Sequence, residues 1–436
     1  MLTHRKQLPN HHLCFDDVVN MIKIRGYNPG RYLFYRPIPF FGKSTEMPKM
    51  QSLINTNLVK KSVLQAIHSV PHSVPTETVT ISCYENAIPS FVETELDRLY
   101  KHINSSLSHH AVQRKANGAS TYVARKGEQA IAILLFKREK RKVSVINEMI
   151  DIAPEELERF ASYIFSNDKS IAVISFSLIG DQIGSLPFPC HQYEISEDIV
   201  LTLPATPEAY LDSLSSKMRR NIRRYLRAIA RDNSTFRFEV CAGDEINEKY
   251  LHDLIDLKKI NIGQKNIRFG IDPDEVDWIV RQAKLSGLVT VALIGNRVCG
   301  GSISLRVNDH YFGQIISYDP AYQKYSLGIL CCYQAICDQI SLGAKESHLC
   351  WGRYQYKYKL MGVQRDRASL DIYRSRSAYW QNAGTVLIKT VKTCLQEWKK
   401  RLLNMEHEEN PSLRFGPLLV KTLRKIKRFR MAGDAA

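Results

Sequence analysis

Apolar and polar positions fall into regular patterns only from Ile88 onward. Between residues 88 and 105 apolar side chains recur at helical spacing, with acidic residues early and Lys101 late, which predicts an opening helix. A hairpin turning at Lys126-Gly127 is expected next, then a strand, a helix and a β-rich run. The predicted ranges are 120–125 and 129–138 for the hairpin, 143–151, 153–165 and 171–179. This order describes an α+β unit.

The same order of patterns then repeats with different residues. The expected helices cover 207–231, 248–261, 274–286 and 328–341, and the expected strands cover 288–294, 298–307, 311–317 and 347–351. Two tandem α+β units, each a central mixed sheet flanked by helices, are the simplest explanation. The predicted fold class is therefore mixed α/β, with a first unit at 81–203 and a second at 204–380.

Both ends of the chain lack this regular pattern. Residues 1–80 contain seven prolines that interrupt any long element, so we expect a loosely ordered arm. Its aromatic and proline-rich stretch 31–41 is suited to dock either on the main body or on a partner. Residues 381–436 are predicted to form a basic helical tail, broken at Asn410-Pro411.

Composition excludes several classes of protein. Of the 436 residues, 44% are hydrophobic, which is enough for a large core. No uncharged apolar run reaches the roughly 18 residues of a membrane span, and the amino end has no signal-peptide pattern, so a cytoplasmic protein is expected. The 10 cysteines include no C-x-x-C pair, and a reduced compartment without a metal site fits them best.

The positive charge is concentrated in two short segments. Lys and Arg number 61 against 44 acids, giving +17, and the segments 217–231 and 414–430 each hold seven basic residues and no acid. The first predicts an amphipathic helix, either solvated or in contact with an anionic glycan, a lipid-linked sugar phosphate or RNA. The second is either a solvated helix or one that lies on an anionic membrane surface.

The segment 311–328 combines a strand, a polar loop and Gly328 at the start of an apolar helix. Backbone N–H groups at such a helix start bind phosphate, and glycine permits close approach to the backbone. The alternative is an ordinary strand-to-helix connection with Ser326 as the N-cap.

This loop resembles the acyl-CoA pyrophosphate loop of the GNAT acyltransferase superfamily, Q/R-x-x-G-x-G/A. Its six residues are Gln323, Lys324, Tyr325, Ser326, Leu327 and Gly328, with Ser326 where the middle glycine is usual. The basic helix 216–224 and the segment 351–362, WGRYQYKYKLMG, resemble the CelD/FemAB-like branch, whose members often carry tandem GNAT domains. The resemblance covers about 88–380.

The resemblance implies acetyl-CoA as donor, a strand 311–317 that pairs with pantetheine, and a neighbouring strand 347–351 that splays away. The first unit, which is acidic and without glycine at 153–156, would be a degenerate copy that helps shape the acceptor cleft.

Several polar residues near this loop are candidates for catalysis. Asp319 is the proposed base and Tyr318 its hydrogen-bonding neighbour, although Asp-Pro is also a common start of a turn. Tyr356 or Tyr358 would hold the proton for the leaving thiolate, because a tyrosine stays protonated at neutral pH. The alternative for either tyrosine is packing against the sheet.

A further group of side chains is expected to be electrostatic or structural. The cations Arg353, Lys357 and Lys359 would bind a negative group, either the cofactor phosphates or an anionic acceptor, or would face solvent. His348 is predicted to be a core residue rather than a base. Glu148 is predicted to be structural, although it could reach the cleft.

The leading functional hypothesis is an acetyl-CoA-dependent N- or O-acyltransferase acting on a sugar or polysaccharide precursor of the cell envelope or of exopolysaccharide. Direct transfer is expected, since no cysteine adjoins the loop with a base at recognisable spacing. One alternative is a FemAB-like transferase that uses aminoacyl-tRNA, and another is a non-catalytic protein that binds polyanions.

Overall fold

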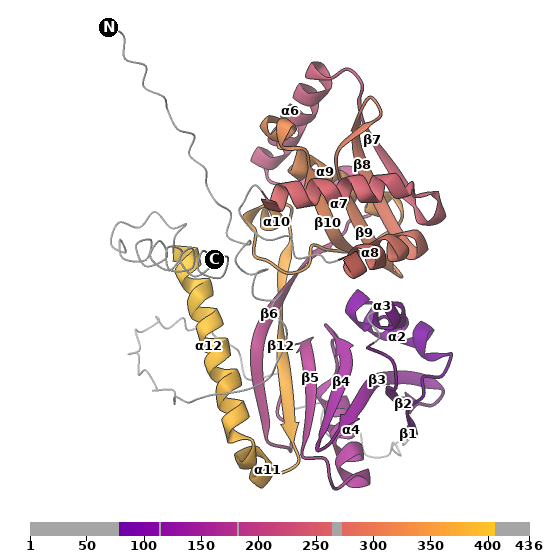
Figure 1. Ribbon diagram of the computed structural model, residues 1–436, viewed down its shortest axis with the longest axis vertical. Helices are drawn as coiled ribbons and strands as arrows, with labels where there is room; N and C mark the ends of the chain where they lie inside the picture. The colour runs from indigo at the N-terminus through magenta and orange to yellow at the C-terminus, as the bar shows by residue number, and fades with distance from the viewer. Residues whose placement is uncertain (1–77, 113–114, 181–182, 264–272, 406–436) are drawn as a thin grey trace, which may run out of the picture.

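The computed structural model describes residues 78–112, 115–180, 183–263 and 273–405. They form a 12-stranded mixed sheet in the order β1-β2-β3-β4-β5-β12-β6-β11-β10-β9-β8-β7, flanked by helices (Figure 1). The predicted mixed α/β class is confirmed. Residues 1–77 of the expected arm lie outside the described residues. Of the expected basic helical tail, 383–405 form a helix, whereas 406–436, including 414–430, lie outside the described residues.

The first half of the chain forms one end of the sheet. Its elements are β1 (Val79–Tyr84), α2 (Val92–Tyr100), η1 (Ile103–Ser105), α3 (Leu107–Val112), β2 (Ser120–Lys126), β3 (Gln129–Glu139), β4 (Lys142–Glu148), α4 (Pro154–Asn167), β5 (Val173–Gly180) and β6 (Cys190–Thr202). The predicted hairpin, helix 153–165 and strand 171–179 correspond to β2–β3, α4 and β5. The strands β1 and β6 were not predicted.

The second half forms the other end. Its elements are α5 (Pro207–Ser213), α6 (Ser216–Asp232), β7 (Phe236–Ala242), η2 (Gly243–Glu245), α7 (Glu248–Gly263), α8 (Pro273–Ser286), β8 (Gly287–Ile294), β9 (Arg297–Val307), β10 (His310–Tyr318), η3 (Pro320–Tyr325), α9 (Leu327–Ser341), β11 (Glu346–His348), α10 (Gln355–Lys359), β12 (Val363–Tyr373), α11 (Arg376–Gln381) and α12 (Ala383–Met405).

One predicted helix of this half is wrong in its extent. The range 207–231 is two helices, because Ser215 caps a new one: its side chain accepts a hydrogen bond from the N–H of Met218 at 3.3 Å. β7 and β12 were also not predicted.

Two long strands join the halves into a single sheet. β12 lies between β5 and β6 and is antiparallel to both, while the far end of β6 pairs with β11. β12 follows the GNAT-like loop in sequence, yet it completes the sheet of the first half. Arg374, just after β12, secures this insertion by donating to the carbonyl oxygens of Ile171 and Phe165 at 2.7 and 2.6 Å.

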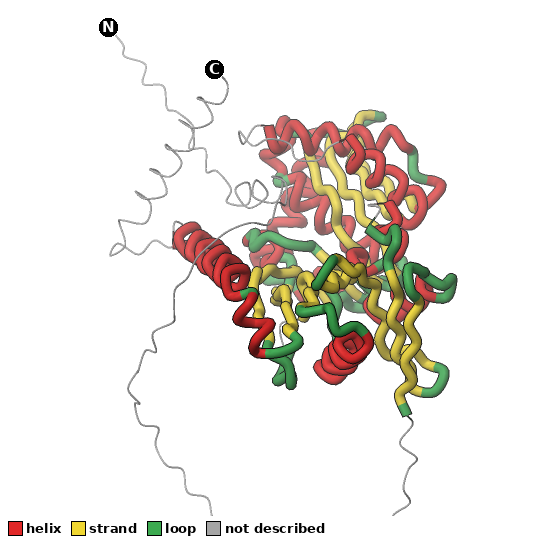
Figure 2. The backbone as a smooth tube through the Cα atoms, turned by 60° about the horizontal axis from the view of Figure 1, so that its bottom comes forward, coloured by secondary structure: helices red, strands yellow, loops and turns green. Residues whose placement is uncertain are grey.

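Helices cover both faces of the second half of the sheet (Figure 2). On one face α5, α6 and α9 share a core with residues such as Leu214, Ile222 and Leu330. On the other face α7 and α8 enclose a second core that includes Leu254 and Trp278. No helix in the described ranges is long and apolar enough to cross a membrane.

Two histidines of α3 are buried. Both ring nitrogens of His110 lack a hydrogen-bond partner among the described residues. Burial lowers the pKa of His110 to about 4 and that of His109 to about 3. Both side chains are therefore neutral in the folded protein at pH values where they are protonated in the unfolded chain.

We accordingly expect the free energy of unfolding to fall as the pH drops below about 6.5, where the unfolded chain binds protons that the folded chain does not. The contribution of His110 alone is about 2 kcal/mol at pH 5. His110→Leu should make this fall smaller in urea titrations between pH 7.5 and 5, whereas His252→Leu, on an exposed face of α7, should leave it unchanged. Equal pH dependence of wild type and His110→Leu would contradict the expectation.

Candidate functional site

The strands β10 and β11 pair over a short distance and then part. They are parallel and in register at three positions, His310↔Glu346, Tyr311↔Ser347 and Phe312↔His348, after which β11 ends and β10 continues to Tyr318. Against β9 on its other side, β10 has a bulge between Gly313 and Ile315. In the described part of the chain no strand pairs with this edge of β10 beyond Phe312. An extended ligand could hydrogen-bond to such an edge.

The loop after β10 leads into α9 through a left-handed residue. Ser326 has φ +51° and precedes the first residue of α9, and its side chain makes no capping hydrogen bond. The ordinary serine cap that was the alternative interpretation is therefore not formed. Since the first N–H groups of an α-helix have no acceptor within the helix, the start of α9 can bind an anion.

The six loop residues have different environments. Gln323 and Lys324 are exposed, whereas Tyr325 and Leu327 are buried. A Cβ atom on Gly328 would lie 2.8 Å from Cδ1 of Tyr318, so the ring of Tyr318 excludes any side chain at this position.

The backbone of Tyr318 is fixed by Asn261 of α7. The N–H of Tyr318 donates to Oδ1 of Asn261 at 3.1 Å, and Nδ2 of Asn261 donates to the carbonyl oxygen of Tyr318 at 2.7 Å. This support was not predicted, because Asn261 lies 57 positions upstream. It holds the end of β10 in place beside the loop.

The basic helix α6 lies against the same loop. The hydroxyl of Tyr325 donates to Oδ2 of Asp232 at 2.8 Å, and Nζ of Lys324 lies 3.8 Å from that oxygen. Tyr225 of α6 also contacts the loop. Its hydrogen bonds with Ser326 and Arg224 lower its pKa. Residues about 100 positions apart in sequence thus form one surface.

Asp319, the predicted base, has both carboxylate oxygens engaged. Oδ1 accepts from the N–H of Ala321 at 2.9 Å and caps η3, while Oδ2 forms an ion pair with Arg297. The side chain is largely buried. This is the turn-starting role that Asp-Pro also indicated, and a catalytic role stays a prediction.

The residues of the segment after β11 point in different directions. Lys357 is only 3% exposed, and its Nζ donates to the carbonyl oxygens of Cys350 and Trp351 at 3.2 and 2.6 Å. Arg353 donates from Nε to Glu197 at 3.2 Å, and Lys359 is exposed. The three cations therefore have three different environments, and their predicted role in binding a substrate stays a prediction.

The two predicted acid candidates differ in exposure. The hydroxyl of Tyr358 donates to Gln364 at 3.0 Å on the surface. Tyr356 is half-buried and packs against the core beneath α9. Glu148 forms an ion pair with Lys115 at 3.5 Å, in keeping with a structural role.

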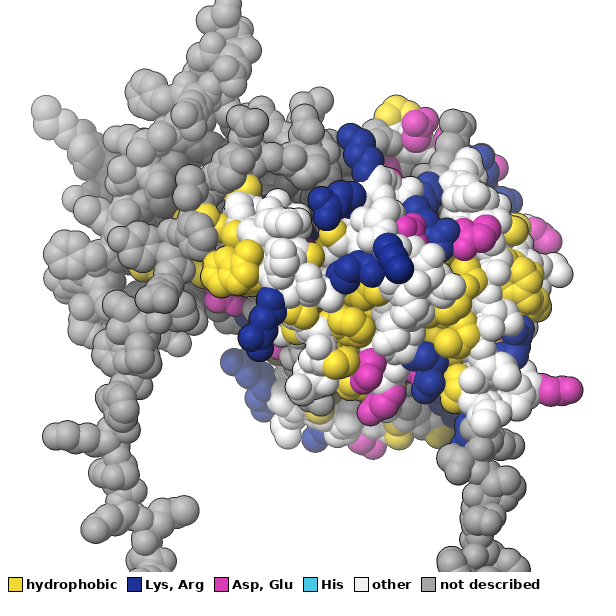
Figure 3. All heavy atoms as spheres, turned by 90° about the horizontal axis from the view of Figure 1, so that it is seen from below, with side chains coloured by type: hydrophobic (Ala, Val, Ile, Leu, Met, Phe, Trp, Pro, Cys, Tyr) yellow, Lys and Arg dark blue, Asp and Glu magenta, His cyan; other side chains and the backbone are white. Residues whose placement is uncertain are grey.

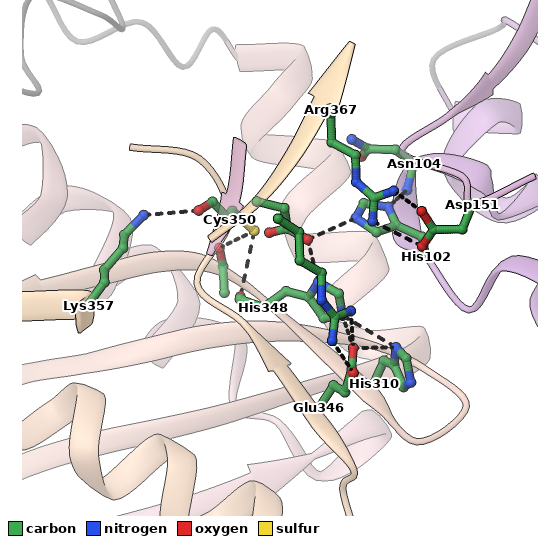
Figure 4. Close-up of polar contacts among 12 residues, drawn as sticks. His102, Asn104, Asp151, His310, Glu346, His348, Cys350, Lys357 and Arg367 are labelled. Atoms are coloured by element: carbon green, nitrogen blue, oxygen red, sulfur yellow. Dashed lines mark hydrogen bonds and ion pairs between the residues drawn. The ribbon is translucent and has the colours of Figure 1, made fainter. Parts of the chain in front are cut away.

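A buried polar network lies at the seam between the halves (Figure 4). Nδ1 of His348 is 2.6 Å from Oδ2 of Asp198, and its Nε2 is 3.4 Å from Oε2 of Glu346. Arg365 donates a hydrogen bond to each carboxylate oxygen of Glu346. Burial opposes protonation of His348, but hydrogen bonds to the two carboxylates raise its pKa overall. Hydrogen bonds with His102 and His348 lower the pKa of Asp198 despite its burial, and hydrogen bonds with His348 and Arg365 lower that of Glu346 to about 2 despite its partial burial.

His102, Asp198 and His348 come close enough to hold a metal ion, with ligand atoms within 4.8 Å of one another. Nδ1 of His102 accepts a hydrogen bond from the N–H of Asn104 at 3.1 Å, so the proton of the neutral ring is on Nε2. Burial lowers the pKa of His102 to about 4, which keeps the ring neutral. Nε2 faces Asp198 at 3.7 Å, and a protonated nitrogen donates rather than ligates. The cluster fits a hydrogen-bond network.

With this geometry in place, the comparisons define the class of fold. Residues 216–358 match the family model of the acetyltransferase (GNAT) domain. That range contains α6, the parting of β10 from β11, the loop and most of α10. Over this range the second half of the chain is therefore similar to a GNAT domain.

Solved structures resemble about two thirds of this chain at low identity. FemX is similar with a TM-score of 0.52 and 8% identity over 69% of this chain and 99% of that one. The C-terminal domain of a putative lysylphosphatidylglycerol synthetase from Agrobacterium fabrum gives 0.42 and 12% over 68% and 94%. A tandem GNAT protein from the clavulanic acid biosynthesis pathway gives 0.36 and 10% over 68% and 98%. At such identities the likeness concerns the fold alone. No curated protein matches the sequence.

Ser326→Gly is expected to stabilise the protein by about 0.5 kcal/mol, because glycine adopts the left-handed conformation without the steric cost of a Cβ atom. Denaturant titration would measure the change. Ser215→Gly is the matched control: φ there is −58° and the side chain caps α6, so this change should destabilise slightly. A loss of stability in Ser326→Gly would mean that the hydrogen bond of the serine side chain with Tyr225 is worth more than the strain.

Proposed function

We propose that this protein is an acyl-CoA-dependent N- or O-acyltransferase whose donor binds where β10 and β11 part. The observation that carries the proposal is the edge of β10 beyond Phe312, which no described strand pairs, followed through η3 by the left-handed Ser326 and the start of α9. An edge of backbone amides followed by an anion-binding helix start suits a ligand with an extended amide arm and a pyrophosphate. The match of 216–358 to the GNAT domain supports the same donor.

Residues of this chain can be given roles in that reaction. Acyl-CoA, when bound, supplies a thioester carbonyl that an amine or hydroxyl can attack. The loop 323–328 would bind the pyrophosphate, and the backbone of β10 beyond Phe312 would hold the pantetheine arm. Asp319 would accept the acceptor's proton, directly or through water and after release from Arg297, with Tyr318 beside it. Tyr356 or Tyr358 would hold the proton for the leaving thiolate at its hydroxyl.

The proposed acceptor is a sugar or polysaccharide precursor, and acetyl is the proposed acyl group. Both rest on the resemblance to CelD/FemAB-like proteins rather than on a contact in the structure. A cytoplasmic location, with peripheral contact to an anionic membrane through residues 414–430, belongs to the same proposal. The first half of the chain would help to shape the cleft that binds the acceptor.

A second candidate function is aminoacyl transfer from tRNA. The arginines of α6, which lie beside the donor loop, favour it because nucleic acid binding depends mainly on neutralising phosphates. The fold is also similar to that of FemX. A non-catalytic polyanion-binding protein is the third possibility.

Calorimetric titration with acetyl-CoA and CoA, with deacylated tRNA at the same salt concentration, tests the donor. Micromolar binding of CoA without binding of tRNA is the expected result. Salt-dependent binding of tRNA without CoA would replace the proposal by the aminoacyl-transfer function. Binding of neither would favour the non-catalytic alternative.

A further inference from the structure

The exposed face of α6 forms an open hollow lined almost entirely by arginine. Its volume is about 930 Å³. The lining residues are Ser216, Arg219, Arg220, Arg223, Arg224, Arg227, Ala228 and Arg231. The opposite end of the molecule looks different, since lysines and arginines there are interspersed with acids and apolar side chains (Figure 3). The hollow is therefore a local concentration of positive charge.

Few of these arginines are neutralised by the protein itself. Arg231 pairs with Asp232, and Arg219 donates to the carbonyl oxygens of Asp212 and Leu214. For Arg220, Arg223 and Arg227 no ion pair is formed within the described residues. Like charges four positions apart on a helix repel each other. An external anion would relieve this repulsion.

The helix that carries the hollow contacts the donor loop at two points. Arg224 hydrogen-bonds with Tyr225, which in turn hydrogen-bonds with Ser326 at the start of α9. At the other end of α6, Asp232 binds Tyr325 of the loop. From Arg220 to Arg231 the helix rises roughly 16 Å. When the pyrophosphate of a ligand lies at the start of α9, the arginines of α6 are thus within reach of a second charged group of that ligand.

We propose that Arg224 and Arg227, at the centre of this hollow, bind the 3′-phosphate of coenzyme A, which makes the site selective for CoA over 3′-dephospho-CoA. The inference rests on the proposed function, since it takes CoA as the donor. A phosphate monoester carries close to two negative charges at neutral pH and three acceptor oxygens, and the planar guanidinium group matches it with paired hydrogen bonds. The pyrophosphate, by contrast, needs only the backbone N–H groups of the loop.

The test measures the Kd of acetyl-CoA and of 3′-dephospho-acetyl-CoA by calorimetry at one salt concentration. Wild type is expected to bind acetyl-CoA about 30-fold more tightly, as charge-assisted hydrogen bonds imply. Arg224→Gln with Arg227→Gln should lower the affinity for acetyl-CoA to that of the dephospho compound and leave the latter's affinity nearly unchanged. The control pair, Lys217→Gln with Lys169→Gln, has the same net charge but lies outside the hollow, and should keep the 30-fold ratio.

The outcomes separate this inference from the proposed function. Equal affinity of wild type for the two compounds would overturn the 3′-phosphate site while leaving CoA as the donor. A ratio lowered equally by the arginine pair and by the control pair would also overturn it, since the effect would then be general electrostatics. Absence of CoA binding, with tight binding of tRNA, would overturn both.

Discussion

Ser326→Asp is expected to weaken the binding of CoA at least about 100-fold, because it places a carboxylate at the site proposed for the pyrophosphate. Aspartate tolerates the left-handed conformation that Ser326 adopts, so the loop should keep its shape. Calorimetric titration with CoA measures the effect, and circular dichroism checks the fold.

Ser326→Asn is the matched control for this change. Asparagine has nearly the same shape, is equally tolerant of the left-handed region and carries no charge, so its affinity for CoA should stay close to that of wild type. Gly328→Asp would be harder to interpret, since any side chain there meets the ring of Tyr318. If Ser326→Asp bound CoA as tightly as Ser326→Asn, the loop would not be the donor site.

Asp198→Asn is expected to destabilise the protein by about 3 kcal/mol, because it leaves the buried His348 without its closest counter-charge. Urea titration measures the loss. The control is Asp366→Asn on β12, an exposed carboxylate 3.9 Å from Arg353, where the change should be below about 0.5 kcal/mol.

The loss should depend on pH in a defined direction. The folded-state pKa of His348 is raised, so its ion pairs stabilise the fold fully below the unfolded pKa of roughly 6.5 and lose this effect as the pH rises through the folded value. The difference between wild type and Asp198→Asn should thus be larger at pH 6 than at pH 9. An equal difference at both values would indicate that His348 is neutral in the fold.

The elements around the donor loop were predictable because their patterns are local. Apolar runs bounded by Gly295-Asn296 and by the Asp319-Pro320 turn define β8 to β10, and the apolar helix after Gly328 is α9. In β12, by contrast, Arg365 and Arg367 interrupt the apolar pattern. Their charges are satisfied by Glu346 and Asp151, which only the folded sheet brings near. Strands stabilised by distant ion pairs give no local signal.

The candidate site could be located in sequence by its local motif, and its role in binding a donor stays a prediction. Gln323 to Gly328 could be found from a short motif, since one loop carries the whole pattern. The contact of α6 with that loop depends on Tyr225 and Asp232. The sequence around them indicates only a basic amphipathic helix and not what it contacts. The support from Asn261 and the burial of Lys357 depend in the same way on tertiary packing. Local motifs identify where a ligand would bind, whereas the groups that hold the site in place come from elsewhere in the chain.

The insertion of β12 between β5 and β6 has a consequence for biosynthesis. During translation the first half leaves the ribosome with the facing edges of β5 and β6 unpaired, and the strand that fills this gap is made more than 160 residues later. Unpaired edges favour association with other chains. The nascent chain would therefore rely on chaperones or on rapid completion of synthesis, and truncation before residue 363 should yield an aggregating product rather than a folded first half.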